Sequence, residues 1–388
     1  MVGISKLYRK FIIFLLLSLV IIFSCSGNIK IFDVSSKFKK SEWTQLGGNA
    51  QHNQNAIKEV TPPLKQLWKT GVERTPTGYM TAAMGNIFVT TMAGKIIALN
   101  YSTGIKISSI KLDHSIGYGM ALDGNNGYFG SISNDNSIFG YQLDKGRYAW
   151  KKNIGPVESM PLVSGGLLYV TSVNGNLYCL DLETGTEKWR FRSNRPFRGT
   201  PVRWEGLIIA ANDSGNVYGL SASTGELKWK YETGKAIMST PVVYNGNVYV
   251  GNLLGQFFSI NAESGKLNWS FSGKGSFYAT ASVDDDAVYS ATASGMLYKI
   301  SITDGVGIWE QDLLDPLSIG MLVSGQYIYI GSLNRKFYSI NKDTGEVIWS
   351  VLLDGRIRTS PLEYNGNIFI GTEDKFVYAF SEAGAISE

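Results

Sequence analysis

Cysteine, histidine and charged residues are scarce in this sequence. Two cysteines and two histidines among 388 residues are too few for a disulfide framework or a zinc site. Lys6, Arg9 and Lys10 lie in an N-terminal leader without acidic residues, and removing them from the 36 basic residues leaves 33 against 32 acidic ones. This balance excludes a typical nucleic-acid binder.

Glycine and aromatic residues are abundant instead. The 44 glycines against 10 prolines, with 12% aromatic and only 18% charged residues, are typical of turn-rich β-structure and exclude disorder for most of the chain. The length alone would suggest two or three domains of about 150 residues each. A single array of repeats is the alternative organisation for a chain of this length.

The N-terminus predicts export. Residues 1–10 carry the positive charges, and Phe11–Ser24 is an uncharged run of 14 residues, short for a membrane span and typical of a signal peptide. The sequence ending in Ser24-Cys25 resembles a bacterial lipobox, although Phe23 is larger than the usual residue there. We therefore expect removal of residues 1–24, acylation of Cys25 and a polar tether over residues 25–42. An ordinary signal peptide or an uncleaved anchor are the alternatives. Ser26 resembles the sorting signal for the outer membrane.

One motif recurs along the rest of the chain: glycine, three further residues and tryptophan. Five copies stand 40 residues apart, with Gly185, Gly225, Gly265, Gly305 and Gly345 leading to Trp189, Trp229, Trp269, Trp309 and Trp349. Two copies are degenerate, since Gly146 leads to Trp150 and Gly104 leads to Ser108, where tryptophan is expected. A second column lies 11 or 12 residues after each tryptophan position and raises the number of units to eight: Met80, Met120, Pro161, Pro201, Pro241, Ala281, Met321 and Pro361.

Each unit alternates apolar and polar residues with a period of two. Tight turns such as Asn245-Gly246 separate the alternating runs, which is the pattern of consecutive β-hairpins. A unit of this length holds a four-stranded antiparallel sheet and no helix. Because such a sheet has two faces to bury, we predict an all-β, eight-bladed propeller over residues 43–388.

The two ends of the chain together complete one blade. The eighth unit has three strands, the last through Phe376–Phe380, whereas Leu64–Lys69, with Trp68, resembles a fourth strand without the three that should precede it. We predict that this segment is the outermost strand of the last blade and closes the ring.

The glycine–tryptophan units resemble the tryptophan-docking repeats of propellers of the pyrroloquinoline quinone (PQQ) type, over about residues 43–385. The resemblance implies that each tryptophan, Trp68 and Trp150 included, stacks on the glycine of an adjoining motif and joins two blades. Trp43–Asn49 is similar to the lead-in segment of such proteins. The single-domain lipidated members include BamB-like scaffold lipoproteins of outer-membrane assembly. The dehydrogenases of the family are larger and carry PQQ, calcium and an Asp base beneath long loops.

The sequence does not match that catalytic equipment. It has no adjacent pair of cysteines, no insertion between units that could cover a cofactor, and no Glu, Asn and Asp trio assignable to calcium. Cys179 shares its column with small residues, so we expect packing rather than reactivity. His52 and His114 have no Cys or His at ligand spacing. We predict no catalytic residue, no metal site and no cofactor.

Basic residues gather where the innermost strands would begin. They are Arg74, Arg195, Arg198, Lys235, Arg356 and Arg358. At one mouth of the ring they would form a partly cationic rim for an anionic group or an acidic peptide. Because Glu73, Asp113, Asp315 and Asp354 interleave with them, a solvated loop edge is the alternative reading. The aromatic column from Tyr178 to Tyr378 is expected to be core.

Two functional hypotheses remain. The leading one is a non-catalytic, monomeric scaffold lipoprotein, anchored on the periplasmic side of the outer membrane and bound to other envelope proteins, with barrel-assembly components as candidate partners. The alternative is a PQQ- or ligand-binding periplasmic protein related to quinone dehydrogenases. In either case, the blade seam beside Ser108 is expected to be the weakest in the ring.

Overall fold

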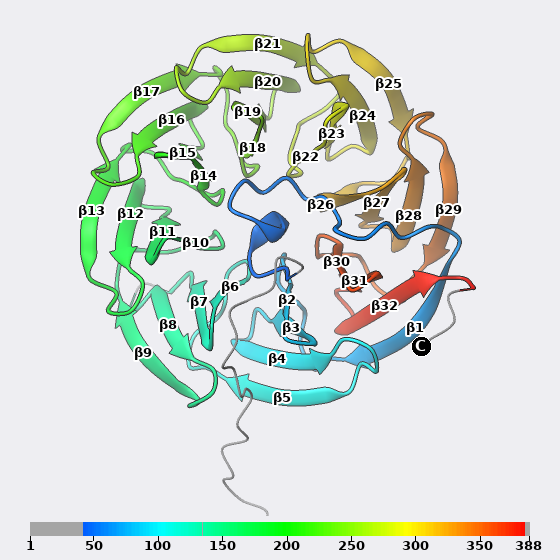
Figure 1. The fold of residues 1–388 in the computed structure, drawn as a ribbon, viewed down its shortest axis with the longest axis horizontal. Coiled ribbons are helices and arrows are strands. Elements are labelled where there is room, and N and C mark those ends of the chain that lie inside the picture. The colour runs from blue at the N-terminus through cyan, green and yellow to red at the C-terminus, as the bar shows by residue number, and fades with distance from the viewer. Residues whose placement is uncertain (1–41, 134, 385–388) are drawn as a thin grey trace, which may run out of the picture.

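The computed structural model describes residues 42–133 and 135–384, and the predicted signal peptide and Cys25 lie outside them. The described residues form eight four-stranded antiparallel sheets around a central axis (Figure 1). The prediction of an all-β, eight-bladed propeller is confirmed. Within these residues, η1 (Leu46–Gly48) is a single 3-10 turn, and no helix there is long and apolar enough to cross a membrane.

The strands follow one another from the axis outward in each blade. Blade 1 consists of β2 (Thr81–Ala83), β3 (Asn86–Thr90), β4 (Lys95–Asn100) and β5 (Lys106–Lys111), and blade 2 of β6 (Met120–Asp123), β7 (Asn126–Gly130), β8 (Ile138–Gln142) and β9 (Arg147–Lys152). Blade 3 consists of β10 (Leu162–Ser164), β11 (Leu167–Thr171), β12 (Asn176–Asp181) and β13 (Glu187–Arg192), and blade 4 of β14 (Val202–Trp204), β15 (Leu207–Ala211), β16 (Asn216–Ser221) and β17 (Leu227–Glu232). Blade 5 consists of β18 (Val242–Tyr244), β19 (Asn247–Gly251), β20 (Gln256–Asn261) and β21 (Leu267–Ser272), and blade 6 of β22 (Ser282–Val283), β23 (Ala287–Ala291), β24 (Met296–Ser301) and β25 (Gly307–Asp312). Blade 7 consists of β26 (Leu317–Ser324), β27 (Tyr327–Ser332), β28 (Lys336–Asn341) and β29 (Val347–Leu352), and blade 8 of β30 (Leu362–Tyr364), β31 (Asn367–Gly371), β32 (Phe376–Glu382) and β1 (Leu64–Gly71).

The two middle strands of each blade are buried on both faces. In β19, for example, every residue after Asn247 is buried, whereas the outermost strand β21 buries only Trp269 and exposes most of the others. The alternating apolar residues of a blade therefore face both neighbouring blades, and the core runs around the ring as a series of clusters between blades.

The last blade is built from both ends of the chain. Strand β1 pairs antiparallel with β32, and Trp68 lies opposite Ala379. The predicted closure of the ring is confirmed. Because β1 supplies the fourth strand of the last blade, no open sheet end remains between the first and last blades.

The two faces of the ring differ. On one face lie the turns between first and second strands, such as Asn245-Gly246, and here residues 43–58 form a segment that we call the lacing segment. The opposite face carries the loops between second and third strands and the links between blades; we call it the open face. Isolated bridges, such as Phe197 to Asn212 and Phe277 to Thr292, hold the links into blades 1, 4, 6 and 8 against a loop of the blade that each link enters.

The lacing segment hydrogen-bonds to all eight blades in turn. Its partners are the innermost-strand residues Ala82, Leu122, Val163, Arg203, Val243, Val283, Val323 and Glu363, one per blade. Six of these contacts use main-chain groups on both sides, for example Val243 N donating to Gln51 O at 3.0 Å. Figure 1 shows this segment running around the axis with η1 at the centre. Leu46 of η1 is buried against Tyr79, Ala121 and Met160.

Candidate functional site

A small polar pocket of about 30 Å³ lies near the axis of the ring on the open face. Tyr118, Glu158, Arg198 and Tyr278 are among the residues that line it. Arg198 bonds to Glu158, the other charged residue of the lining, so these two charges cancel, and Asp213, outside the lining, lies 3.9 Å from Arg198. The hydrogen bond with Glu158 raises the pKa of Arg198. The pocket is therefore polar but electrically neutral, and its arginine is a structural partner rather than a free anion ligand.

The six basic residues proposed as a rim all lie on the links of the open face, but in two opposite sectors. Arg195, Arg198 and Lys235 belong to the links into blades 4 and 5, whereas Arg74, Arg356 and Arg358 belong to those into blades 1 and 8. The structure does not bring the six side chains together. Asp315, which lies at an equivalent position, is buried and accepts hydrogen bonds from Tyr338 and Asn334.

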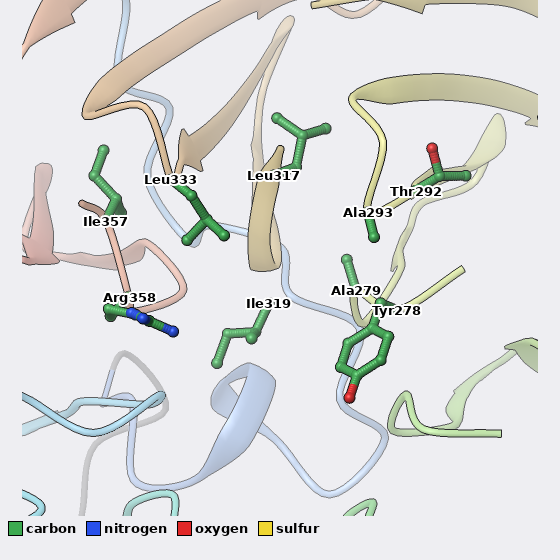
Figure 2. A pocket seen from close by; sticks show the side chains of 9 residues that line it. All are labelled: Tyr278, Ala279, Thr292, Ala293, Leu317, Ile319, Leu333, Ile357 and Arg358. Atoms are coloured by element: carbon green, nitrogen blue, oxygen red, sulfur yellow. The ribbon is translucent and has the colours of Figure 1, made fainter. Parts of the chain in front are cut away.

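A second pocket, of about 260 Å³, lies on the open face between blades 6, 7 and 8 (Figure 2). Most of its lining is apolar, with Arg358, Tyr278 and Thr292 as the polar exceptions. Figure 2 shows Arg358 and Tyr278 on opposite sides of Ile319, which also lines the polar pocket. The sequence did not predict this pocket, because the pocket exists where side chains are too small to fill the space between blades.

The docking tryptophans lie across the seams between blades. Trp68, Trp150, Trp189, Trp229, Trp269 and Trp309 cover, in this order, Gly104, Gly185, Gly225, Gly265, Gly305 and Gly345 of the next blade. Each of these indoles donates its Nε1 hydrogen to a main-chain carbonyl of that blade, at 2.8 to 3.1 Å. A Cβ atom on Gly305 would lie 2.6 Å from Cδ2 of Trp269, so only glycine allows this approach.

Trp349 and Ser108 depart from this arrangement. Trp349 contacts the rings of Phe337 and Phe380, with centroids 6.1 Å apart in both cases, and has no glycine beneath it among the described residues. Ser108 lies in β5, where the next docking glycine would be Gly146. Gly146 is exposed, and a Cβ atom placed on it would meet nothing within 4 Å. Within the part of the chain that the structure describes, no side chain therefore covers this glycine at the seam between blades 1 and 2.

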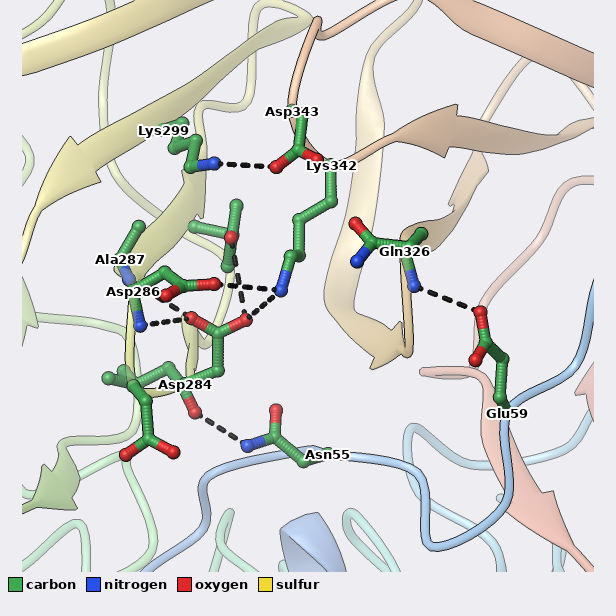
Figure 3. Close-up of polar contacts among 12 residues, drawn as sticks. Asn55, Glu59, Asp284, Asp286, Ala287, Lys299, Gln326, Lys342 and Asp343 are labelled. Carbon is green, nitrogen blue, oxygen red and sulfur yellow. Dashed lines mark hydrogen bonds and ion pairs between the residues drawn. The ribbon is translucent and has the colours of Figure 1, made fainter.

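A buried ion-pair network between blades 6 and 7 was not anticipated from the sequence (Figure 3). Nζ of Lys342 lies 2.9 Å from Oδ2 of Asp284 and 3.2 Å from Oδ2 of Asp286, and the side chains of Lys342 and Asp284 are only 10% and 16% exposed. Burial alone would lower the pKa of Lys342, but bonding to these carboxylates outweighs it and raises the pKa. The network joins two blades electrostatically at the seam that Trp309 also crosses.

His52 and Cys179, two residues of types often used in catalysis, lie in the core. His52 is fully buried in the lacing segment, and this burial lowers its pKa to about 3. Cys179 is also fully buried, and burial raises the pKa of its thiol to about 11, well away from a reactive thiolate. The aromatic column from Tyr178 to Tyr378 is buried as well. Within residues 42–133 and 135–384, no three His, Cys, Asp or Glu side chains gather in a group that could hold a metal ion.

The described residues do not fit a PQQ cofactor. A flat tricyclic quinone with three carboxylates needs a wide slot and several available cations. The axial pocket of about 30 Å³ is too small for it, and Arg198 there is already bonded to Glu158. The apolar pocket offers a single arginine against the three carboxylates of the cofactor.

Comparisons with known proteins agree with this architecture. A family model described as outer membrane protein assembly factor BamB matches residues 134–241, 234–317 and 294–387. A protein of that name from Burkholderia pseudomallei is 23% identical over 175 residues, which span 44% of this chain and 43% of that relative.

Solved structures show the same fold. The crystal structure of BamB from Moraxella catarrhalis is 18% identical, with a TM-score of 0.71, over 82% of this chain and 99% of that one. Quinohemoprotein alcohol dehydrogenase from Comamonas testosteroni is 12% identical, with a TM-score of 0.76, over 90% of this chain and 82% of the other. At these identities the fold alone is shared, so the similarity to the dehydrogenase does not transfer its activity.

Proposed function

We propose, from the premise that this chain belongs to the family of outer membrane protein assembly factor BamB, that it is a non-catalytic scaffold lipoprotein of the bacterial envelope. It is anchored through Cys25 on the periplasmic side of the outer membrane and binds other envelope proteins, among them components of barrel assembly. The buried Cys179 and His52, and the neutral axial pocket, support a role without chemistry of its own.

The observation that carries the proposal is a set of large apolar side chains exposed on the open face. Met92, Ile132, Leu254 and Leu314 are 63%, 53%, 62% and 82% exposed. They project from the loops and links of four different blades, so they present several contacts to one broad partner surface. Apolar side chains of this kind form the buried centre of many protein interfaces.

Affinity purification of the lipidated protein from its own membranes tests the proposal. Leu254→Ser with Leu314→Ser should abolish co-purification of barrel-assembly components. The control is Leu227→Ser with Ile308→Ser, which removes two exposed apolar side chains, 44% and 51% exposed, from the outer strands β17 and β25 and should preserve co-purification. Equal recovery of the same proteins with both variants would overturn the assignment of the open face.

The lipid anchor is a separate prediction. Because the uncharged run ends at Ser24-Cys25 and a polar segment follows, Cys25 should become the acylated N-terminus. Cells fed a clickable palmitate analogue should label the natural protein and spare Cys25→Ala. Equal labelling of the two proteins would contradict the prediction.

A further inference from the structure

The apolar pocket on the open face has the properties of a ligand site, and we call it the Arg358 pocket. Its walls come from three successive blades: Ala279 and Ala293 from blade 6, Leu317, Ile319 and Leu333 from blade 7, and Ile357 from the link into blade 8. Its volume of about 260 Å³ exceeds the roughly 150 Å³ in which an apolar protein cavity binds benzene. One aromatic ring or short aliphatic chain therefore fits inside.

The pocket exists because blade 6 has a small residue where its neighbours have a large one. The amide of Ala293 donates to Ser276 O, just as Leu253 N donates to Ala236 O and Leu333 N donates to Pro316 O. The three residues thus occupy equivalent loop positions in blades 5, 6 and 7. Only in blade 6 is the side chain reduced to a methyl group, so leucine at position 293 would fill the space without a change of backbone.

The mouth of the pocket favours an anion. Arg358 is half exposed there and lies 3.3 Å from Oε1 of Glu373, while Arg356 lies 3.8 Å from Oε2 of the same carboxylate. Two guanidinium groups share one carboxylate, so one positive charge is left over beside the apolar walls. Tyr278 adds a half-exposed hydroxyl on the other side of Ile319 (Figure 2).

We propose that the Arg358 pocket binds an apolar carboxylate, with its hydrophobic group between blades 6 and 7 and its carboxylate at the guanidinium of Arg358. Two sources share this chemistry: the C-terminal residue of a polypeptide and a free carboxylic acid. The inference does not rest on the proposed scaffold function, because it follows from the walls and the charge of the pocket alone.

Titration of the full-length protein with 3-phenylpropionate, followed by calorimetry or ligand-observed NMR, tests the proposal. A ligand of this size should bind with a dissociation constant of about 1 mM. Ala293→Leu should abolish binding of both 3-phenylpropionate and its neutral amide. Arg358→Gln should weaken the carboxylate about tenfold and leave the amide unchanged. Arg356→Gln should weaken carboxylate binding by about threefold, less than Arg358→Gln, because it removes the excess positive charge but no side chain that lines the pocket.

Melting temperatures equal to that of the natural protein establish that the variants are folded. Absence of binding to the natural protein, or undiminished binding to folded Ala293→Leu, would overturn the proposal. If binding is found, acetyl-Gly-Gly-Phe with a free carboxyl group and octanoate distinguish the sources. Tighter binding of the peptide supports a chain end, and tighter binding of octanoate supports a free acid.

Discussion

The seam between blades 5 and 6 and the seam between blades 1 and 2 come from the same repeat, yet only the first carries a docking tryptophan. Trp269 is 7% exposed and covers Gly305, whereas Ser108 leaves Gly146 uncovered. Both seams nevertheless share a buried core, since one cluster joins blades 5 and 6 and another joins blades 1 and 2. The inner strands thus hold neighbouring blades together, and the tryptophan seals only the outer part of the seam.

The largest loss of stability should follow removal of the N-terminal strand β1, which we call the clasp, together with the lacing segment. A chain that begins at Gly71 loses most of β1, including Trp68, and the lacing segment, whereas a chain that begins at Glu42 keeps both. We expect the first to melt at least about 10 °C below the second or to lose its cooperative transition. Thermal unfolding followed by circular dichroism compares them. Equal melting temperatures would mean that neither segment closes the ring.

Removing the docking tryptophan should have the next largest effect. Trp269→Ala deletes a buried indole and its hydrogen bond to Ile302 O, so it should cost about 3–5 kcal/mol. Ser108→Ala, at the equivalent position of blade 1, should change stability by less than about 0.5 kcal/mol. Urea denaturation measures both. Similar losses for the two variants would show that Ser108 already seals its seam by other contacts.

Substitution of the docking glycines tests the contact between glycine and indole while the tryptophan stays in place. Gly305 and Gly146 have φ values of 75° and 62°, so alanine at either position carries a backbone cost of about 1 kcal/mol. Only at Gly305 does the added methyl group meet the indole, which should add about 1–3 kcal/mol. The difference between Gly305→Ala and Gly146→Ala in urea denaturation therefore measures how closely the tryptophan packs. A difference near zero would contradict close docking.

The smallest effect on stability is expected from placing a tryptophan at the position of Ser108. Ser108→Trp places an indole beside the uncovered Gly146 and should be neutral or stabilising by up to about 1 kcal/mol. In the natural protein, hydrogen exchange should be faster for amides of residues 87–108 than for those of residues 248–269. Equally slow exchange in the two segments would rule out a weak seam while leaving the eight blades intact.

The repeat made the blades and the clasp predictable. Period-two alternation, turns such as Asn245-Gly246 and the unmatched strand with Trp68 define them in the sequence. The lacing segment was not predictable, because its contacts are mainly with main-chain groups of residues as different as Ala82 and Arg203. The Arg358 pocket arises from missing volume at Ala293, which carries no signal in a single repeat.

The buried network of Lys342 did leave a signal that went unused. Lys342 stands in a column otherwise occupied by Leu182, Ala222, Ala262 and Ile302, so a charge in that column required a partner. Its position relative to Asp284 depends on the packing of two blades, which spacing along the chain does not give. The proposed basic rim shows the same limit, because the sequence placed Arg198 at the correct mouth but not beside Glu158.

The lacing segment and β1 impose an order on folding. Ile57 N bonds to Oε2 of Glu363, 306 residues later, and β1 pairs with the final strand β32. Ile57 and β1 therefore find their partners only after the last blade has been synthesised. Contacts so distant in sequence close slowly, and until then blade 8 has an unpaired edge. Completion of the chain thus has to precede completion of the ring.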